Sequence, residues 1–265
     1  MHPMLNTAVK AARAAGRVIT RAWDRTDTLN VREKSRNDYA SEVDLQAEQT
    51  IVQILRHAYP EHGILAEEGG HTEGNDFVWV IDPLDGTTNF LHGMPHVSIS
   101  IALKHRGRLE QGVVYDPLRE ELFTATRGSG AFLNDRRIRV ADRPDLHGAL
   151  LGTGIPFRDT QNLDRYLRTL RVLIEDTAGV RRPGSAALDL AYVAAGRFDG
   201  FWEMSLRDWD MAAGVLLVQE AGGLVSDFEG KPDVFRRGDV VAGNPKILKA
   251  MLQRLHTALA EAPST

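Results

Sequence analysis

The sequence predicts a layered α/β protein in which helices lie between and outside two β-sheets. Much of the first half of the chain consists of apolar runs separated by short turns, which is typical of antiparallel strands. The second half alternates strand-like runs with segments of helical periodicity. A length of 265 residues suffices for one large core or two closely packed subdomains. We therefore expect one domain over residues 1–265, with an antiparallel subdomain at about 1–145 and an α/β subdomain at about 146–265.

The composition excludes several classes of protein. Apolar residues make up 43% of the chain and charged residues 26%, as in ordinary globular proteins. The net charge of −4 argues against a general binder of polyanions. The absence of cysteine excludes disulfides, thiolate metal sites and cysteine nucleophiles. The sequence shows neither a signal peptide nor a run of residues apolar enough to cross a membrane, so we expect a cytoplasmic protein.

Two helices are predicted before the first strand. The first has an apolar face at helical spacing, formed by Leu5, Ala8, Val9, Ala12, Ala15, Ile19 and Ala22. A polar, turn-like segment at 34–44 follows, and Asp44 is the expected N-cap of the second helix. That helix has an apolar face of Ala47, Ile51, Ile54, Leu55 and Ala58 and ends before Pro60.

A short strand is predicted at Gly63–Ala66, directly before two acidic residues. Glu67 and Glu68 are followed by two glycines, and such a pair is usually part of a solvated loop. Because loops gather at one end of a sheet, the pair could instead close over a cleft formed by the next strand.

The central stretch is Val78–Phe90, in which a buried strand ends at a carboxylate. Asp82 is followed by a proline turn and by Asp85, and Gly86 and Thr87 come next. Two neighbouring carboxylates repel each other unless a cation lies between them, and oxygen-only ligands favour Mg²⁺. The small turn residues leave backbone N–H groups free to face a phosphate. An ordinary acidic turn that caps a helix is the alternative interpretation.

Further strands are predicted at Val97–Leu103, Leu109–Tyr115 and Glu121–Ala125, as antiparallel neighbours in one sheet. A second set of strands begins at Ala149–Thr153, and a helix follows at Leu163–Ile174. The two regions account for the two sheets of the predicted fold.

The last third of the chain contains two helices that begin with small residues. The first opens at Gly184–Ala187, where the open backbone and the helix dipole favour an anion. Arg181 and Arg182 precede it, and we expect a surface role for both. Glu203 ends a strand that begins at Phe198, and Asp210 stands at the start of the next helix. A strand at Val240–Ala242 and a helix at Ile247–Leu259 complete the chain.

Three separated motifs together closely resemble the inositol monophosphatase family of Mg²⁺-dependent, lithium-sensitive phosphatases. They are Glu67-Glu68, the string D-P-L-D-G-T-T at 82–88, and W-D-M-A-A-G at 209–214 with E-A-G-G at 220–223. The likeness extends from about Ala8 to Lys249, and the runs YDPLREELFTATRGSGA and GSAALDLAYVAAGR are similar to its bacterial SuhB branch. The resemblance implies a five-layer αβαβα sandwich and a homodimer.

The resemblance also implies the metal ligands. Glu67, Asp82 and the backbone carbonyl of Leu84 would hold one Mg²⁺. Asp82, Asp85 and Asp210 would hold a second Mg²⁺ ion. A third, weaker ion would use Glu67 together with water.

Catalytic and substrate-binding roles follow from the same resemblance. Asp44 and Thr87, together with the metal-holding Glu67, would activate the attacking water. The N–H groups of Gly86 and Thr87 would bind the phosphate. The remaining contacts to a sugar or cyclitol would come from Asp85, Gly184, Ser185, Ala186 and Glu203, with Leu84 and Asp210 bordering the same site. The second acid is commonly followed by serine in the family, whereas Gly69 stands here.

We therefore expect a phosphatase that acts on inositol monophosphate and related polyol or sugar monophosphates. Fructose-1,6-bisphosphate and nucleotide phosphatases are alternatives in the same superfamily.

A second hypothesis is a role without catalysis in ribosomal RNA transcription antitermination, through binding of NusA and RNA polymerase. Arg136, Arg137 and Arg139 could contact RNA in that role, but a solvated hairpin is the favoured interpretation of this patch. His92 and His96 are not expected to form a zinc site, because Gly93 and Pro95 break the loop between them.

Overall fold

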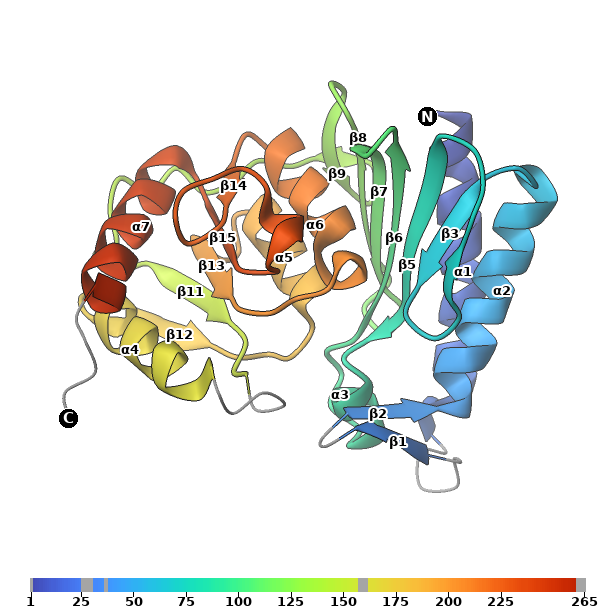
Figure 1. The fold of residues 1–265 in the computed structure, drawn as a ribbon, viewed down its shortest axis with the longest axis horizontal. Coiled ribbons are helices and arrows are strands. Elements are labelled where there is room, and N and C mark those ends of the chain that lie inside the picture. The colour runs from blue at the N-terminus through green and yellow to red at the C-terminus, as the bar shows by residue number, and fades with distance from the viewer. Residues whose placement is uncertain (1, 25–30, 36–37, 157–161, 261–265) are drawn as a thin grey trace.

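Two β-sheets alternate with three layers of helices, which gives the predicted five-layer αβαβα sandwich (Figure 1). The computed structural model describes residues 2–24, 31–35, 38–156 and 162–260, and for 31–40 it describes only the backbone. Within these ranges no helix is long and apolar enough to span a membrane.

The first layer consists of α1 (Pro3–Ala22) and α2 (Glu42–Ala58), which pack against each other and against the outer face of the larger sheet (Figure 1). Small side chains let α1 lie close to its neighbours, because Ala8, Ala12 and Ala15 are buried. Before α2, β1 (Val31–Ser35) and β2 (Asp38–Ser41) form an antiparallel hairpin, where the sequence predicted a turn-like segment.

The larger sheet has eight strands in the order β10-β9-β8-β7-β6-β5-β3-β4. All neighbouring strands are antiparallel except β3 and β5, which are parallel. Between them the chain turns back into β4, which pairs with β3 at the sheet edge, and then reverses again into β5 on the other side of β3. The bounds are β3 Gly63–Ala66, β4 Gly70–Thr72, β5 Phe77–Asp85, β6 Ser98–His105, β7 Arg108–Asp116, β8 Glu121–Thr126, β9 Gly130–Leu133 and β10 Arg136–Arg137.

The middle layer is formed by α5 (Ala186–Ala194) and α6 (Asp208–Glu220), which lie between the two sheets (Figure 1). Both helices are apolar on nearly every face because both are covered by sheets and by each other. Their close contact needs a glycine: a Cβ on Gly214 would lie 2.6 Å from Cβ of Leu190.

The smaller sheet has five strands in the order β12-β11-β13-β15-β14, with parallel and antiparallel neighbours. Its outer face is covered by α4 (Leu163–Ile174) and α7 (Pro245–Ala260) (Figure 1). The strand bounds are β11 Leu150–Thr153, β12 Gly179–Arg181, β13 Gly200–Glu203, β14 Leu224–Ser226 and β15 Val240–Gly243, with a 3-10 turn, η3, at Val234–Arg236.

One local prediction is wrong in detail. The N-cap of α2 is Ser41, and Asp44 occupies the third helical position. The Ser41 hydroxyl accepts a hydrogen bond from the Val43 N–H, while the Asp44 carboxylate accepts one from the Ser41 N–H. Aspartate suits either position, so the sequence alone did not separate them.

Candidate active site

A cavity of about 970 Å³ opens where the two sheets and the middle helices meet. Its walls come from the end of β5, from α3 (Thr87–Leu91), from the starts of α5 and α6, from the end of β13 and from the turn η3. All of the predicted site residues line it except Asp44, which lies buried beneath Thr87. Segments more than a hundred residues apart therefore meet at one place.

Asp82 and Asp85 flank an irregularity in the pairing of β5 with β6. This irregularity turns the strand end toward the cavity and brings both carboxylates into its lining. The Asp82 carboxylate is buried and accepts a hydrogen bond of 3.0 Å from the Leu84 N–H. Burial raises its pKa well above the usual value, and the negative charges of Glu67, Asp85 and Asp210 raise it further.

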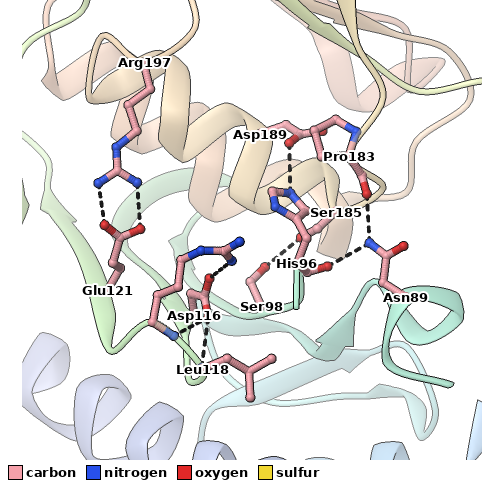
Figure 2. A network of polar contacts seen from close by, with 11 residues as sticks. Asn89, His96, Ser98, Asp116, Leu118, Glu121, Pro183, Ser185, Asp189 and Arg197 are labelled. Carbon is pink, nitrogen blue, oxygen red and sulfur yellow. Dashed lines mark hydrogen bonds and ion pairs between the residues drawn. The ribbon is translucent and has the colours of Figure 1, made fainter. Parts of the chain in front are cut away.

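Asp85 connects the strand end to the start of α5. Its Oδ2 accepts hydrogen bonds from Ser185 Oγ at 2.7 Å and from the Ala187 N–H at 2.8 Å. Burial raises the pKa of Asp85 to about 7, against the opposing effect of these two donors. Ser185 Oγ also lies 3.0 Å from Ser98 Oγ on β6 (Figure 2).

Glu67 and Asp210 also line the cavity. The loop that carries Glu67 is held by two hydrogen bonds, from the Glu67 N–H to the Ile81 carbonyl and from the Glu68 N–H to the Glu48 carboxylate. Asp210 is the third residue of α6, and its carboxylate accepts a hydrogen bond of 2.7 Å from the Arg207 N–H.

Burial and mutual repulsion make this acidic group a fitting site for a cation. The neighbouring charges of Glu67, Asp85 and Asp210 raise the pKa of Asp82 beyond the effect of its burial, which indicates that negative charge gathers here. Among the residues that the structure describes, no three acidic or histidine side chains stand around a common point at ligand distance. In this arrangement Asp82, Asp85 and Asp210 each turn an oxygen to a local donor.

Asp44 and Thr87 form a buried polar pair at the floor of the cavity. Thr87 Oγ1 lies 2.9 Å from Asp44 Oδ1 and 3.1 Å from the Leu84 carbonyl, so both acceptors compete for its single proton. The other oxygen of Asp44 accepts hydrogen bonds from the N–H and the hydroxyl of Ser41. Burial raises the pKa of Asp44 in spite of these donors. The arrangement leaves the Thr87 oxygen able to accept a hydrogen bond from water.

Gly86 provides the tight turn between β5 and α3. Its φ of 97° is in the left-handed region, and a Cβ there would lie 3.0 Å from the His96 carbonyl. Another residue would therefore be strained and crowded at this position. The turn sets the backbone of Gly86 and Thr87 against the cavity, where the phosphate was predicted to bind.

Gly184, Ser185, Ala186 and Glu203 also line the cavity, and the Gly184 carbonyl lies close to the Gly86 turn. Burial raises the pKa of Glu203 well above its usual value, and the charges of Asp189, Asp210 and Asp85 add to the effect. A Cβ on Gly154 would overlap the Glu203 carboxylate, so that glycine gives the side chain its room.

Asn89 is a site residue that the sequence did not reveal. Its Nδ2 donates hydrogen bonds of 2.8 Å to the carbonyls of both His96 and Pro183 (Figure 2). One side chain thus ties the segment before β6 to the segment before α5. His96 Nε2 also lies 3.2 Å from the buried Asp189 of α5, and burial lowers the pKa of His96 to about 4. Because Pro183 and Asp189 lie more than ninety residues along the chain from Asn89 and His96, spacing carries no signal for these contacts.

The arginines that were predicted to lie at the surface are exposed, and one of them also lines the cavity. Arg181 and Arg182 are both exposed, as expected, but Arg182 also lines the cavity. Arg136, Arg137 and Arg139 are exposed at and near the hairpin of β9 and β10, as the favoured interpretation required. Three further arginines line the cavity that were not predicted, namely Arg207, Arg236 and Arg237.

Comparisons with known proteins agree over nearly the whole chain. A profile of the inositol monophosphatase family matches residues 1–262. The chain is 60% identical over 265 residues to a Pseudomonas aeruginosa protein named Nus factor SuhB, with 98% of each covered. The crystal structure of extragenic suppressor protein SuhB from Bartonella henselae has 47% identity and a TM-score of 0.94, covering 96% of this chain and 98% of that one. The structure of Thermotoga maritima IMPase has 36% identity and a TM-score of 0.88, with 97% and 98% covered.

Proposed function

The chain belongs to the inositol monophosphatase family, and we propose that it releases phosphate from inositol monophosphate and from related polyol and sugar monophosphates. The observation that carries this proposal is the meeting of Glu67, Asp82, Asp85 and Asp210 in one cavity, above the buried pair of Asp44 and Thr87. Four acids that line one cavity suit a divalent cation and a phosphate better than a neutral ligand.

We propose that the cation is Mg²⁺, in two sites or three. Glu67, Asp82 and the Leu84 carbonyl would hold one ion, and Asp82, Asp85 and Asp210 would hold another. Carboxylate and carbonyl oxygens are the ligands that Mg²⁺ prefers. Bound ions would supply charge neutralisation at the phosphate and acidity to the attacking water.

The protein's own part of the reaction would be to place the water and accept its proton. The Thr87 hydroxyl can accept a hydrogen bond from the water while it donates to Asp44. Because burial raises the pKa of Asp44, this carboxylate is a stronger base than an exposed aspartate. The backbone of Gly86 and Thr87 would bind the phosphate oxygens.

The substrate hydroxyls would lie against the part of the cavity lined by Asp85, the start of α5 and Glu203. Asp85 and Glu203 offer acceptor oxygens there, and Ser185 offers a hydroxyl. Gly184 and Ala186 have small side chains, which leave the start of α5 open to a ring. These contacts would orient the ester oxygen for departure from phosphorus.

The proposed metal site is tested by Asp85→Asn. The amide oxygen can still accept from Ser185 and Ala187, so the variant should fold, but it loses the charge that would hold the ion. We expect Mg²⁺-dependent phosphate release from inositol 1-phosphate to fall at least about a hundredfold. Asp135→Asn, on the exposed hairpin turn, is the control. Near-normal turnover by Asp85→Asn would refute the assignment. Inhibition by Li⁺ together with a preference for inositol phosphates would support the inositol phosphatase over its superfamily alternatives.

A second function is suggested by the name of the Pseudomonas aeruginosa relative, Nus factor SuhB, at 60% identity. We propose that this chain also binds NusA and RNA polymerase in an antitermination complex, as a homodimer. Affinity capture with the Asp85→Asn variant separates the two functions. Capture of NusA by this variant would show that binding does not require hydrolysis, and its absence with both wild type and variant would exclude the second function.

A further inference from the structure

Two residues outside the cavity, His96 and Asp189, form a buried pair that takes no part in the proposed metal binding or water activation. Nε2 of His96 lies 3.2 Å from Oδ1 of Asp189, and the two side chains are only 12% and 2% exposed (Figure 2). Among the residues that the structure describes, His96 is the one hydrogen-bond partner of the Asp189 carboxylate. The pair joins the segment before β6 to the first turn of α5.

A buried carboxylate with a single hydrogen bond lowers the stability of a protein. Burial raises the pKa of Asp189 well above its usual value, against the opposing effect of the Arg182 charge. The pKa of His96 is about 4, so its ring is neutral near pH 7 and does not compensate a negative charge. Apolar side chains of similar size would fill this space without such a loss. The pair is therefore better explained by the position that it fixes than by stability.

One of the two segments that the pair joins borders the turn proposed for the phosphate. The His96 carbonyl accepts a hydrogen bond of 2.8 Å from Asn89 Nδ2. A Cβ added to Gly86 would lie 3.0 Å from this carbonyl and 3.3 Å from the Gly184 carbonyl. The turn at Gly86 is thus packed against one carbonyl from each segment. A displacement of the segments relative to each other would therefore move the turn.

The other segment is the start of α5. Asp189 is the fourth residue of this helix, and its N–H donates a hydrogen bond of 2.9 Å to the Ser185 carbonyl. Ser185 Oγ and the Ala187 N–H both donate to the Asp85 carboxylate. The place of Asp189 therefore sets where these donors stand, and with them the part of the cavity proposed for the substrate hydroxyls.

We propose that His96 and Asp189 are positioning residues, which hold the start of α5 at a fixed distance from the phosphate turn. This inference rests on the proposed phosphatase function and concerns the orientation of its substrate. A phosphate at Gly86 and Thr87 and hydroxyls at the start of α5 then keep one relative position, in which the ester oxygen is placed for departure. The alternative is that the pair only fills space between β6 and α5.

The experiment compares the wild type with H96F/D189L, which fills the same space without a hydrogen bond. Because both polar partners are removed together, the free energy of unfolding should be unchanged or higher. Mg²⁺-dependent phosphate release is measured from inositol 1-phosphate and from 4-nitrophenyl phosphate, which has no hydroxyls to place. The ratio of kcat/KM for the inositol ester to kcat/KM for the nitrophenyl ester should fall about tenfold, since only the first depends on the distance from the turn to α5.

Conservative single substitutions should keep this ratio. An amide can donate or accept, so D189N and H96Q each retain a hydrogen bond between the two positions. The matched control is H62F, because His62 is also buried, stacks on Tyr59 and Phe77 and lies outside the cavity. We expect its ratio to equal that of the wild type.

An unchanged ratio in H96F/D189L, or equal losses on both substrates, would overturn the inference, as would a fall of the same size in H62F. Should H96F/D189L fail to fold, the single variants H96Q and H96A decide. A ratio that H96Q keeps and H96A loses supports the positioning role, and equal ratios contradict it.

The phosphatase proposal fails by itself if the wild type hydrolyses neither ester. Hydrogen–deuterium exchange of the backbone at 84–97 and 183–190 in the metal-free protein then decides the inference. Faster exchange of both segments in H96F/D189L than in the wild type supports the proposed link between them, and unchanged exchange in either segment contradicts it.

Discussion

Asn89 shows how one buried side chain can join two parts of a site. Both hydrogens of its amide are used by backbone carbonyls, one at His96 and one at Pro183 (Figure 2). The amide nitrogen must face these carbonyls, because the amide oxygen would be repelled there. Asn89 therefore holds the segment around Gly86 against the start of the substrate wall.

We expect Asn89→Asp to destabilise the protein. A carboxylate would bring a buried charge against two carbonyl oxygens and would lose both donors, so the free energy of unfolding should fall by about 1–3 kcal/mol or more. Urea unfolding measures this change. The matched control is Asn75→Asp, where the exposed side chain only accepts a hydrogen bond from the Phe77 N–H, a role that aspartate keeps. Equal stability of the two variants would contradict this role of Asn89.

The places of Asp85 and Thr87 in the cavity were predictable because each residue belongs to a dense local motif. The sequence did not reveal Asn89, which bonds to a distant segment, or Arg207, Arg236 and Arg237, which line the cavity. An arginine in a loop has the same local pattern whether it faces solvent or a cavity. Its role depends on the neighbouring segments, which spacing does not encode.

At the scale of elements, close packing between α1 and the larger sheet depends on Gly16. A Cβ at this buried position would lie 2.7 Å from Cε1 of the Tyr115 ring on β7 and 3.1 Å from Pro117. Alanine is otherwise the better helix former by about 1 kcal/mol. Whether Gly16→Ala lowers or raises the free energy of unfolding therefore shows whether the steric contact or the helix propensity prevails.

We expect Gly16→Ala to lower the free energy of unfolding by about 1–3 kcal/mol, because the Tyr115 ring is buried and cannot move freely. In the background of Tyr115→Ala the same substitution should be much less destabilising, because the ring is gone and only the weaker contact with Pro117 opposes the helix propensity. Denaturant unfolding of the four proteins measures the coupling. Destabilisation of the same size in both backgrounds would refute the packing explanation.

Elements with a sustained apolar pattern were predicted better than the others, and β3, with four residues, is the shortest of those named here. The helices α1, α4 and α7 and the strands β3, β7 and β8 lie within a few residues of their predicted bounds, because each has a sustained apolar pattern. The short strands β4, β9, β10, β12 and β14 were not predicted. Strands of two to four residues exist because a neighbour offers a hydrogen-bonding edge, and two or three residues are too few for a periodicity.

At the scale of the whole molecule, the acidic group lies where the two halves of the chain meet. Asp82 and Asp85 come from the larger sheet, and Asp210 and Glu203 come from the second half of the chain. We propose that the boundary between two subdomains lies near residue 145, between the last strand of one sheet and the first strand of the other. Because the acids lie on both sides of this boundary, their repulsion opposes the packing of the two subdomains against each other.

Without divalent cations, stability should fall as the pH rises. The pKa of Asp85 is about 7 in the folded protein and near 3.8 in the unfolded chain, so between these values the folded state binds more protons. Its contribution to the free energy of unfolding therefore decreases from about pH 4 to pH 7 and stays low above that. The raised pKa values of Asp82 and Glu203 add in the same direction.

Saturating Mg²⁺ should reverse this loss, and more strongly at pH 8 than at pH 5.5, because the ion binds the ionised carboxylates. At a hundredfold excess over Kd the expected gain is about 2.7 kcal/mol. Urea unfolding with EDTA or with Mg²⁺ at the two pH values measures both effects. The Asp85→Asn variant should show a smaller pH dependence. A metal-free protein that becomes more stable between pH 5.5 and pH 8 would contradict the assignment of these carboxylates.

The sequence by itself determined the fold class, the family and the carboxylate motifs, because apolar periodicity and dense local strings are properties of neighbouring residues. Only the tertiary structure decided that Asp82, Asp85 and Asp210 share one cavity, that Ser41 and not Asp44 caps α2, and which arginines face the site. The physical reason is that burial, repulsion and hydrogen bonding depend on distance in space. The chain folds so that residues a hundred positions apart become neighbours, and no local pattern records which ones.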